Sequence, residues 1–154
     1  MTDCAIMLGG NLDGTAEAMK SALQTLRNSG FIISAVSSPY RSAAVDCVPG
    51  TPDFTDVAVT GSWRGSAEEL LALCQKLERA AGRPAVHSSR ESRILDCDII
   101  IFGNELRNSP HLTIPHPRAK MRLFVLEPLA EIAPQMLFPD DGTSVAENLH
   151  KLRK

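Results

Sequence analysis

Two carboxylates stand two positions apart in an otherwise apolar run near the middle of the 154-residue chain. They are Asp96 and Asp98, and the apolar run spans residues 94–102. In a β-strand, alternate side chains share a face, so both carboxylates point the same way with Cα atoms about 6.6 Å apart. Because repulsion and desolvation of two such groups oppose folding, the pair needs a compensating cation. Two interpretations stay open: arginine partners on a wet sheet face, or a divalent metal, for which an all-oxygen ligand set favours magnesium.

Basic residues surround the acidic pair. The chain as a whole has a formal net charge of −2, yet residues 83–122 hold more basic than acidic side chains. The basic ones are Arg83, Arg90, Arg93, Arg107, Arg118, Lys120 and Arg122, and the acidic ones are Glu91, Asp96, Asp98 and Glu105. Carboxylates that hold a metal among guanidinium groups fit a bound polyphosphate, because arginines neutralise the phosphate charge that the metal leaves. A solvated basic surface explains some of these residues equally well.

Several common functional motifs are absent from the sequence. There is no GxxxxGK[ST] loop, and the glycines at 9 and 10 are too few for a dinucleotide fingerprint. Neither GxSxG nor HExxH occurs. The slightly acidic net charge argues against a generic nucleic-acid or membrane-surface binder, and no run of eighteen apolar residues could span a bilayer. We therefore expect no nucleic-acid partner and no membrane partner.

The residues that carry this chemistry need a scaffold, and periodicity predicts its elements. Strands are expected at 4–8, 31–36, 54–63 and 94–102, and helices at 15–28 and 66–81, the second opened by a capping box at Ser66 and Glu69. Loops are expected at 41–52 and 83–92, the second of them mobile, and short helices near 120–126 and 145–152. This order predicts an α+β, ferredoxin-like β-α-β-β-α-β sandwich with a C-terminal extension of short strands and helices, as a single domain over residues 1–154.

The sandwich assigns a role to each face of the sheet. Both main helices are expected on one face, and the other face is expected to be open or covered by loops and the C-terminal extension. On the strand of the two carboxylates, the alternating apolar side chains are expected on the helix-covered face: Leu95, Cys97, Ile99 and Ile101.

The cysteines indicate a reducing compartment. They are widely spaced and form no CxxC pair: Cys4, Cys47, Cys74 and Cys97. A secreted disulfide scaffold is usually smaller and richer in cysteine, and a zinc site places its ligands closely. The first residues lack the basic region of a secretory signal. We expect a cytoplasmic protein whose cysteines are reduced and mostly buried.

Seven short motifs, taken in order, resemble those of the 6-hydroxymethyl-7,8-dihydropterin pyrophosphokinase family over nearly the whole chain. They are Gly9-Gly10-Asn11-Leu12; Ser37-Ser38-Pro39-Tyr40-Arg41-Ser42; Pro52-Asp53-Phe54-Thr55-Asp56; Glu78 with Gly82-Arg83; Arg93-Ile94-Leu95-Asp96-Cys97-Asp98-Ile99 with Phe102-Gly103-Asn104; Leu112-Thr113-Ile114-Pro115-His116; and Arg122 and Phe124 with Leu129. Each motif alone is weak, and their shared order and spacing carry the resemblance.

The resemblance implies an ATP-dependent enzyme of folate biosynthesis, which transfers the terminal diphosphate of ATP to the hydroxymethyl group of the pterin and releases AMP. In such an enzyme, Asp96 and Asp98 would hold two Mg²⁺ ions that bridge the triphosphate. The phosphates would be met by basic side chains, namely Arg83, Arg93, His116 and Arg122. The nucleotide side would include Gln75 and Glu78, with adenine read by the backbone of Ile99, Leu112 and Thr113.

For the pterin, the resemblance implies an aromatic slot between Phe54 and Phe124. Polar contacts would lie near Ser42, Val45 and Asp56. Two stacked aromatic rings give a flat heterocycle an apolar slot, and a carboxylate accepts hydrogen bonds from an amino-pyrimidine edge.

The chain departs from the family pattern at several positions. Asp56 stands where the family usually has asparagine. In the 83–92 loop, Ala85 and Arg90 stand where many members have arginine and tryptophan. Because loop closure often sets the rate of such enzymes, these changes bear on efficiency, and Arg90 is expected to supply a replacement charge. The metal pair and the inner phosphate residues are intact, so we expect activity.

Two other interpretations compete with this one. The first is a diverged paralogue that phosphorylates another heterocyclic alcohol. The second is a non-enzymatic ferredoxin-like ligand-binding or RNA-binding module, since fold alone does not choose a function. An RNA module needs exposed aromatic and basic residues on the open sheet face, but here that face carries carboxylates and the chain has one Tyr and one Trp. We expect a monomer whose partners are ATP and the reduced hydroxymethyl pterin.

Overall fold

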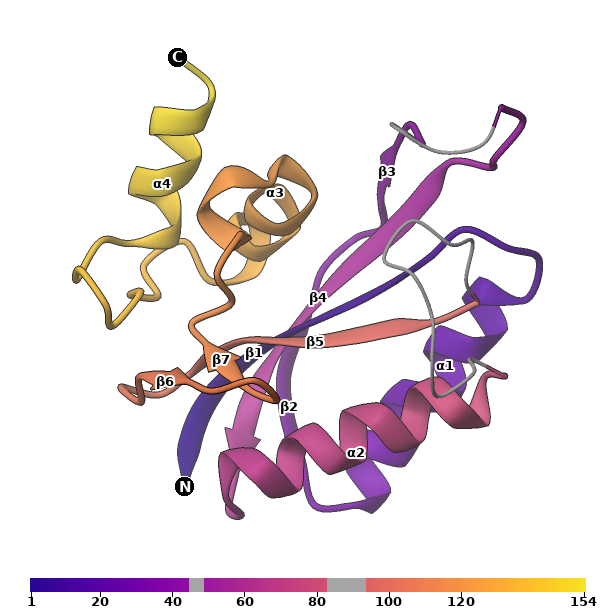
Figure 1. The fold of residues 1–154 in the computed structure, drawn as a ribbon, viewed down its shortest axis with the longest axis horizontal. Coiled ribbons are helices and arrows are strands. Elements are labelled where there is room, and N and C mark those ends of the chain that lie inside the picture. The colour runs from indigo at the N-terminus through magenta and orange to yellow at the C-terminus, as the bar shows by residue number, and fades with distance from the viewer. Residues whose placement is uncertain (45–48, 83–93) are drawn as a thin grey trace.

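One antiparallel sheet organises the chain, with helices packed on both of its faces (Figure 1). The computed structural model describes residues 1–44, 49–82 and 94–154. Its elements are β1 (Thr2–Gly10), α1 (Thr15–Asn28), β2 (Ile32–Val36), β3 (Tyr40–Ser42), β4 (Phe54–Trp63), α2 (Ala67–Ala80), β5 (Asp96–Phe102), β6 (Arg107–Asn108), β7 (Thr113–Ile114), the 3-10 helix η1 (Ala119–Met121), α3 (Leu123–Ile132) and α4 (Val145–Leu152). The predicted long strands and helices are therefore present, and the predicted loop at 83–92 lies outside the described residues.

The strand order of the main sheet is β2-β4-β1-β5, and all neighbouring strands are antiparallel. A further short strand, β3, pairs with the start of β4. The predicted loop from residue 41 is wrong for Arg41 and Ser42, which belong to β3. The reason lies in the length of β4: its pairing with β2 ends at Val59, which leaves residues 54–56 to be paired by β3. β6 and β7 form a separate two-stranded sheet.

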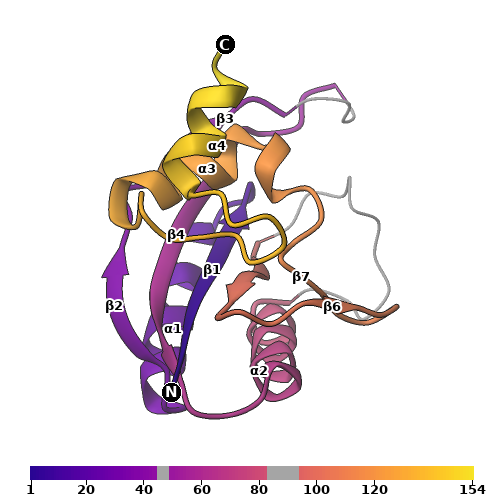
Figure 2. The ribbon, with the colours of Figure 1, turned by 90° about the vertical axis from the view of Figure 1, so that its left-hand side faces the viewer.

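The helices α1 and α2 cover one face of the main sheet (Figures 1 and 2). The core between them is built from the apolar faces of both helices and from alternating strand residues; its largest fully buried members include Ile6, Leu8, Leu26, Phe31 and Leu70. The predicted capping box opens α2: Ser66 Oγ accepts from Glu69 N–H, and the Glu69 carboxylate accepts from Ser66 N–H.

The opposite face of the sheet is covered by the C-terminal extension, as Figure 2 shows for α3 and α4. A second buried cluster lies there, which includes Ile100, Ile101, Leu126 and Phe138. The prediction that Ile101 faces the α1–α2 side is wrong. The β1–β5 register shifts next to Ile100, so the alternation of side chains is reset and Phe102 packs on the α1–α2 side instead.

The cysteines within the described residues agree with the prediction of reduced, buried thiols. Cys4, Cys74 and Cys97 are buried and free, and Cys47 lies outside the described residues. In the parts of the chain that the structure describes, no helix is long and apolar enough to cross a membrane.

Candidate active site

Three carboxylates gather on one face of the sheet where β4, β1 and β5 run side by side. Gly9 of β1 stands opposite Asp56 of β4 on one side and opposite Asp96 of β5 on the other, so the three positions form one row. Cross-strand partners share a face, and Asp98 follows Asp96 by two residues on that same face. The prediction assigns Asp56 to the pterin and the other two carboxylates to the metal. The strand register nevertheless brings all three carboxylates onto one surface.

Gly9 makes the room for this row. A Cβ atom at Gly9 would lie 2.4 Å from Oδ1 of Asp56, so the carboxylate of Asp56 occupies the space above the glycine. Asp56 itself is buried. A second close approach follows at Gly10, where a Cβ atom would lie 2.2 Å from the carbonyl oxygen of Ile94. The two glycines, which the sequence indicated as the end of the first strand, are instead strand residues that let neighbouring groups come close.

Asp98 lacks sufficient positive charge around it. Burial, followed by the charges of Asp96 and Glu78, raises the pKa of Asp98 to about 8, although Arg122 acts in the opposite direction. The side chain keeps some solvent exposure but is surrounded by protein on most sides. A cation at this position would relieve the repulsion.

Magnesium fits this deficit. Within residues 1–44, 49–82 and 94–154, no group of three or more His, Cys, Asp or Glu residues could hold a metal unaided. Magnesium does not require one, because it is usually bound by one or two carboxylates together with water and the phosphates of a substrate. The donor set of Asp96 and Asp98 suits that mode of binding, because the raised pKa of Asp98 shows that its ionised form lacks a sufficient neutralising cation.

Arg122 supplies the positive charge that counteracts the raised pKa of Asp98. It lies close enough to Asp98, Asp96 and Asp56 for their charges to raise its pKa, although burial and the neighbouring Arg118 leave the pKa lowered overall. Its guanidinium carbon is 5.2 Å from the ring centre of Phe124, within range of a cation–π interaction. Arg122 is thus close both to the carboxylates of this sheet face, Asp56, Asp96 and Asp98, and to Phe124, one of the two rings predicted to stack on the pterin.

His116 presents one defined nitrogen to its surroundings. Its backbone N–H donates to the carbonyl of Ile100 at 2.9 Å, which fixes it beside β5. Its Nδ1 accepts a hydrogen bond from the backbone N–H of Arg118 at 3.2 Å, so the neutral ring carries its proton on Nε2. Burial, and then the charges of Arg122 and Arg118, lower the pKa of His116. The neutral ring is therefore a hydrogen-bond donor through Nε2.

Arg118 belongs to this group, although it is not among the predicted site residues. Its exposed side chain lies close enough to His116 and Arg122 to lower the pKa of both. The only signal in the sequence was the excess of basic residues between 83 and 122. We call residues 116–122 the cationic segment, because it carries His116, Arg118, Lys120 and Arg122.

Glu78 has a structural contact at the edge of the sheet. Its Oε2 accepts a hydrogen bond from the backbone N–H of Cys97 at 2.9 Å, so α2 is tied to β5 beside the carboxylate pair. Gln75 is exposed one turn earlier on α2. Both residues therefore stand at the β5 edge, and both are predicted to lie on the nucleotide side of the site.

The three backbone positions predicted to read adenine lie near the same edge. Ile99 is on the edge strand β5, and Thr113 begins β7. Leu112 uses its backbone locally: its N–H donates to Ser109 Oγ at 3.1 Å, and its carbonyl accepts from Ser109 N–H at 3.0 Å. The backbone N–H of Leu112 is therefore already engaged within its own loop.

The predicted pterin residues surround the start of β4. Ser42 pairs with Phe54 in the β3–β4 register, and Phe54 and Phe124 are both half-buried. Both rings keep part of their surface exposed, unlike those of the fully buried Phe102 and Phe138. The remaining predicted site residues lie outside the described residues, and they are Val45, Arg83 and Arg93, together with Ala85 and Arg90 of the predicted mobile loop.

The fold and the charges define a class of protein: an α+β domain that holds an acidic pair and a cationic segment on one face of its sheet, an arrangement suited to a metal-bound polyphosphate. Known proteins narrow this class. Residues 5–134 match the family model described as 7,8-dihydro-6-hydroxymethylpterin-pyrophosphokinase (HPPK). The chain belongs to this family.

Named relatives agree with the family model. The chain is 34% identical over 146 residues to a Synechocystis protein named 2-amino-4-hydroxy-6-hydroxymethyldihydropteridine pyrophosphokinase, and the match covers 94% of this chain and 73% of that protein. A Haemophilus influenzae protein of the same name is 33% identical over 141 residues, covering 91% and 87% of the two chains. The folic acid synthesis protein fol1 of Pneumocystis carinii is 31% identical, and there the chain spans only 20% of its relative.

Solved structures support the fold. The chain aligns with Plasmodium falciparum HPPK-DHPS at a TM-score of 0.72 and 11% identity, over 97% of this chain and 45% of the other. A second HPPK-DHPS, crystallised in complex with substrates, aligns at a TM-score of 0.68 and 11% identity, over 97% and 43%. The domain architecture is thus the one found in HPPK domains.

Proposed function

We propose that this chain transfers the diphosphate of ATP to the hydroxymethyl group of 6-hydroxymethyl-7,8-dihydropterin in folate biosynthesis, releasing AMP. The observation that carries the proposal is the placement of Asp96 and Asp98 on one sheet face, with Arg122 close to both. Family membership supports the same reaction.

Asp96 and Asp98 would hold two Mg²⁺ ions together with the phosphates of ATP. When bound, the metal supplies charge neutralisation for the transferred group. The raised pKa of Asp98 supports this assignment, because a carboxylate that lacks a cation in the free protein gains most from one in the complex.

The cationic segment would receive the phosphate oxygens. The neutral ring of His116 donates through Nε2. Arg122 offers its guanidinium group close to the carboxylates at 56, 96 and 98. Arg118 adds a charge near both. Arg83 and Arg93 are assigned to the same task on the basis of their motifs. Gln75 and Glu78 flank the nucleotide, and Ile99 and Thr113 offer their backbone to adenine.

The pterin would lie between Phe54 and Phe124. Asp56, buried and placed over Gly9, would accept hydrogen bonds from the amino-pyrimidine edge, with Ser42 and Val45 nearby. Asp56 and Asp96 flank the same glycine, so a pterin edge held by Asp56 and phosphates held at Asp96 would be neighbours. In-line attack of the hydroxymethyl oxygen on the β-phosphorus depends on such positioning and on charge neutralisation.

The protein would act as a cytoplasmic monomer, and its core would be a ferredoxin-like sandwich. The antiparallel order β2-β4-β1-β5, with α1 and α2 on one face, supports that classification, in which β3 and the C-terminal extension are additions.

The test is AMP release from magnesium-ATP, with the reduced hydroxymethyl pterin present or omitted. We expect release that depends on the pterin, and a loss of two or more orders of magnitude in kcat for Asp96→Ala and for Asp98→Ala. Release without pterin, or none, overturns the proposal. AMP or ADP formed with another heterocyclic alcohol, but not with the pterin, would favour the diverged paralogue, for which Asp56 in place of the usual asparagine is the motivating feature.

A further inference from the structure

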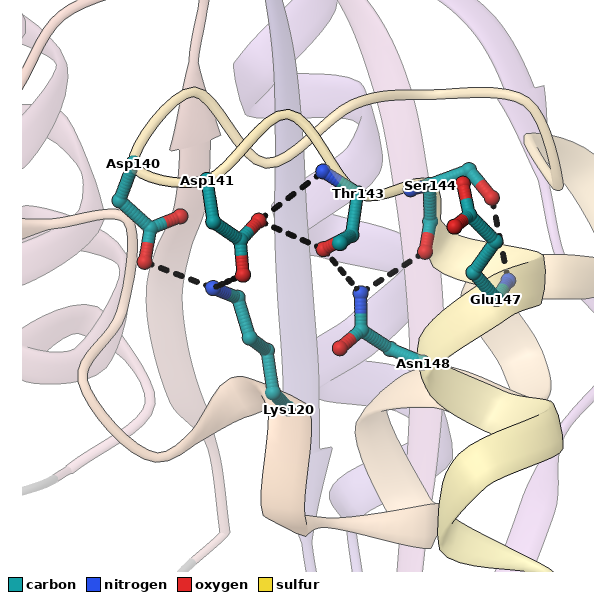
Figure 3. Close-up of polar contacts among 7 residues, drawn as sticks. All are labelled: Lys120, Asp140, Asp141, Thr143, Ser144, Glu147 and Asn148. Carbon is teal, nitrogen blue, oxygen red and sulfur yellow. Dashed lines mark hydrogen bonds and ion pairs between the residues drawn. The ribbon is translucent and has the colours of Figure 1, made fainter.

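Lys120 lies within the cationic segment but is bound by two carboxylates from the C-terminal extension. Its Nζ donates to Asp140 Oδ2 at 2.6 Å and to Asp141 Oδ2 at 2.9 Å (Figure 3). The same Nζ lies 5.2 Å from the ring centre of the fully buried Phe138. We call this group of Lys120, Asp140 and Asp141 the Lys120 bridge.

The Lys120 bridge continues into α4 through a chain of hydrogen bonds (Figure 3). Asp141 Oδ1 accepts from the backbone N–H and the hydroxyl of Thr143, at 2.9 and 2.6 Å. The hydroxyl oxygen of Thr143 accepts from Asn148 Nδ2 at 2.7 Å. Ser144 and Glu147 form the capping box that starts α4. One end of the bridge is thus fixed to a helix whose residues Val145 and Leu149 are buried in the second core.

The carboxylate side of the bridge lies beyond the part of the chain that matches the family model, which ends at residue 134. The lysine side lies inside it, between two residues of the proposed phosphate site. η1, which contains Lys120, begins directly after Arg118 and ends directly before Arg122. Any rotation of η1 would therefore move both arginines.

The cationic segment needs such support in the free protein. Burial is the main cause of the lowered pKa values of His116 and Arg122, and like charges add to it: Arg122 and Arg118 act on His116, and Arg118 acts on Arg122. Lys120 would add a further positive charge. Burial alone would lower the pKa of Lys120, but its hydrogen bonds to Asp140 and Asp141 outweigh burial and raise it, and the same contact lowers the pKa of Asp141.

We propose that Lys120 is a positioning residue for the phosphates of ATP: held by Asp140 and Asp141, it fixes the cationic segment so that His116 and Arg122 are already in place before ATP binds. The proposal rests on the proposed function for its substrate. Its structural content, an ordered segment in the free protein, is independent of that function.

The experiment compares three variants with the wild type. Lys120→Met removes the charge and keeps the length of the side chain, Lys120→Arg keeps the charge, and the double variant Asp140→Asn/Asp141→Asn removes the acceptors and leaves the lysine free. We expect Lys120→Met and the double variant to raise KM for ATP about tenfold, with KM for the pterin within about twofold of the wild type. Lys120→Arg should restore most of the loss.

The double variant separates positioning from direct binding. If Lys120 itself bound phosphate, freeing it from the aspartates would lower KM for ATP, and only Lys120→Met would raise it. That pattern would overturn the proposal. So would equal rises in KM for both substrates, because a general loss of structure does not select ATP.

Two measurements on the ligand-free protein test the inference even if the chain proves to have another substrate. Amide hydrogen exchange at Arg118 and Arg122 should accelerate at least tenfold in Lys120→Met, and the ¹⁵N shifts of His116 should show loss of the single Nε2–H tautomer. The matched control is Arg153→Met, which removes an ion pair between α4 and Glu127 of α3 without touching the cationic segment. Unchanged exchange at Arg118 and Arg122 in Lys120→Met, or an equal effect from Arg153→Met, would refute the positioning role.

Discussion

At the scale of single residues, the site depends on charges that the protein leaves unbalanced. His116 is held neutral by its surroundings while its Nδ1 is occupied by a backbone N–H. Burial is the main reason for its lowered pKa, and Arg122 and Arg118 contribute to it. A histidine in this state binds an anion through Nε2–H and gains a proton readily once a negative charge is near, because the anion offsets the repulsion from the two arginines.

Arg118→Ala tests this arrangement directly. The substitution keeps the backbone N–H that binds Nδ1 of His116 and removes only the guanidinium charge, so the pKa of His116 should rise toward its usual value near 6.5. Because the wild-type pKa is lowered, His116 costs the folded state stability as pH falls through 6.5, and this cost should shrink in the variant. An NMR titration of His116 measures the shift, with Arg153→Ala as the control arginine. An unchanged pKa would mean that Arg118 is too far away to act on the ring.

At the scale of elements, β5 carries two opposed requirements. Its inward face contributes Cys97 and Ile99 to the core under α1 and α2, whereas its outward face presents Asp96 and Asp98. A strand in such a position would be more stable with apolar or neutral residues on both faces. The acidic pair therefore lowers the stability of the free domain in favour of its function, a trade that is common at active sites.

The cost of the pair should appear as an unusual pH dependence. The pKa of Asp98 is raised to about 8 by burial and by Asp96 and Glu78. Between the pKa of the unfolded chain, near 4, and this value, the folded state binds the extra proton, so its stability should fall as pH rises. At pH 8 without metal, we expect Asp98→Asn to raise Tm by about 5 °C. With magnesium-ATP, the same variant should reduce AMP release by two or more orders of magnitude.

Thermal melts in EDTA between pH 5 and 8 measure the effect. Asp141→Asn is the opposite control: hydrogen bonds from Lys120 and Thr143 lower the pKa of Asp141, so its contribution to stability is present above the unfolded pKa and is lost only in acid. That variant should lower Tm at pH 8. If Asp98→Asn destabilises the metal-free protein as well, the acidic pair is already compensated within the fold.

The sequence predicted the long elements well because each of them has its own periodic apolar face. α1 and α4 begin and end where predicted, and the capping box of α2 is present. The errors fall where pairing with another strand decides the outcome. β3 exists because β4 is longer than β2, and Ile101 changes face because the β1–β5 register shifts. Both depend on distant partners, which local pattern cannot supply.

The candidate site was predictable to a similar degree. Asp96 and Asp98 were found through strand alternation, which is a local property. The row of Asp56, Gly9 and Asp96 was not, because it arises from the register of three strands. Arg118 was also missed as a site residue, since its relevance depends on how η1 brings it near Arg122.

At the scale of the whole molecule, two cores share one sheet. The first lies under α1 and α2, and the second lies under α3 and α4. The site lies on the sheet face that the second core covers in part, beside the first turn of α3. The C-terminal extension thus both closes the fold and carries Asp140 and Asp141 to the cationic segment. The extension is therefore tied directly to the cationic segment.

The charge of the molecule is divided in the same way, and this division predicts a selective effect of salt. The net charge of −2 would repel ATP at long range, but residues 116–122 carry three permanent positive charges, of which that of Lys120 is paired with two carboxylates. We therefore expect the attraction of ATP to include short-range contacts with Arg118 and Arg122, which are partly open to solvent and so open to screening. Raising KCl from about 50 to about 200 mM at constant free magnesium should raise KM for ATP roughly threefold or more, and KM for the uncharged pterin by less than about 1.5-fold. Steady-state kinetics with each substrate varied in turn measure both values. In Arg118→Ala, the slope of log KM for ATP against the logarithm of the KCl concentration should be smaller than in the wild type. Equal slopes in the two proteins would show that Arg118 does not face the phosphates.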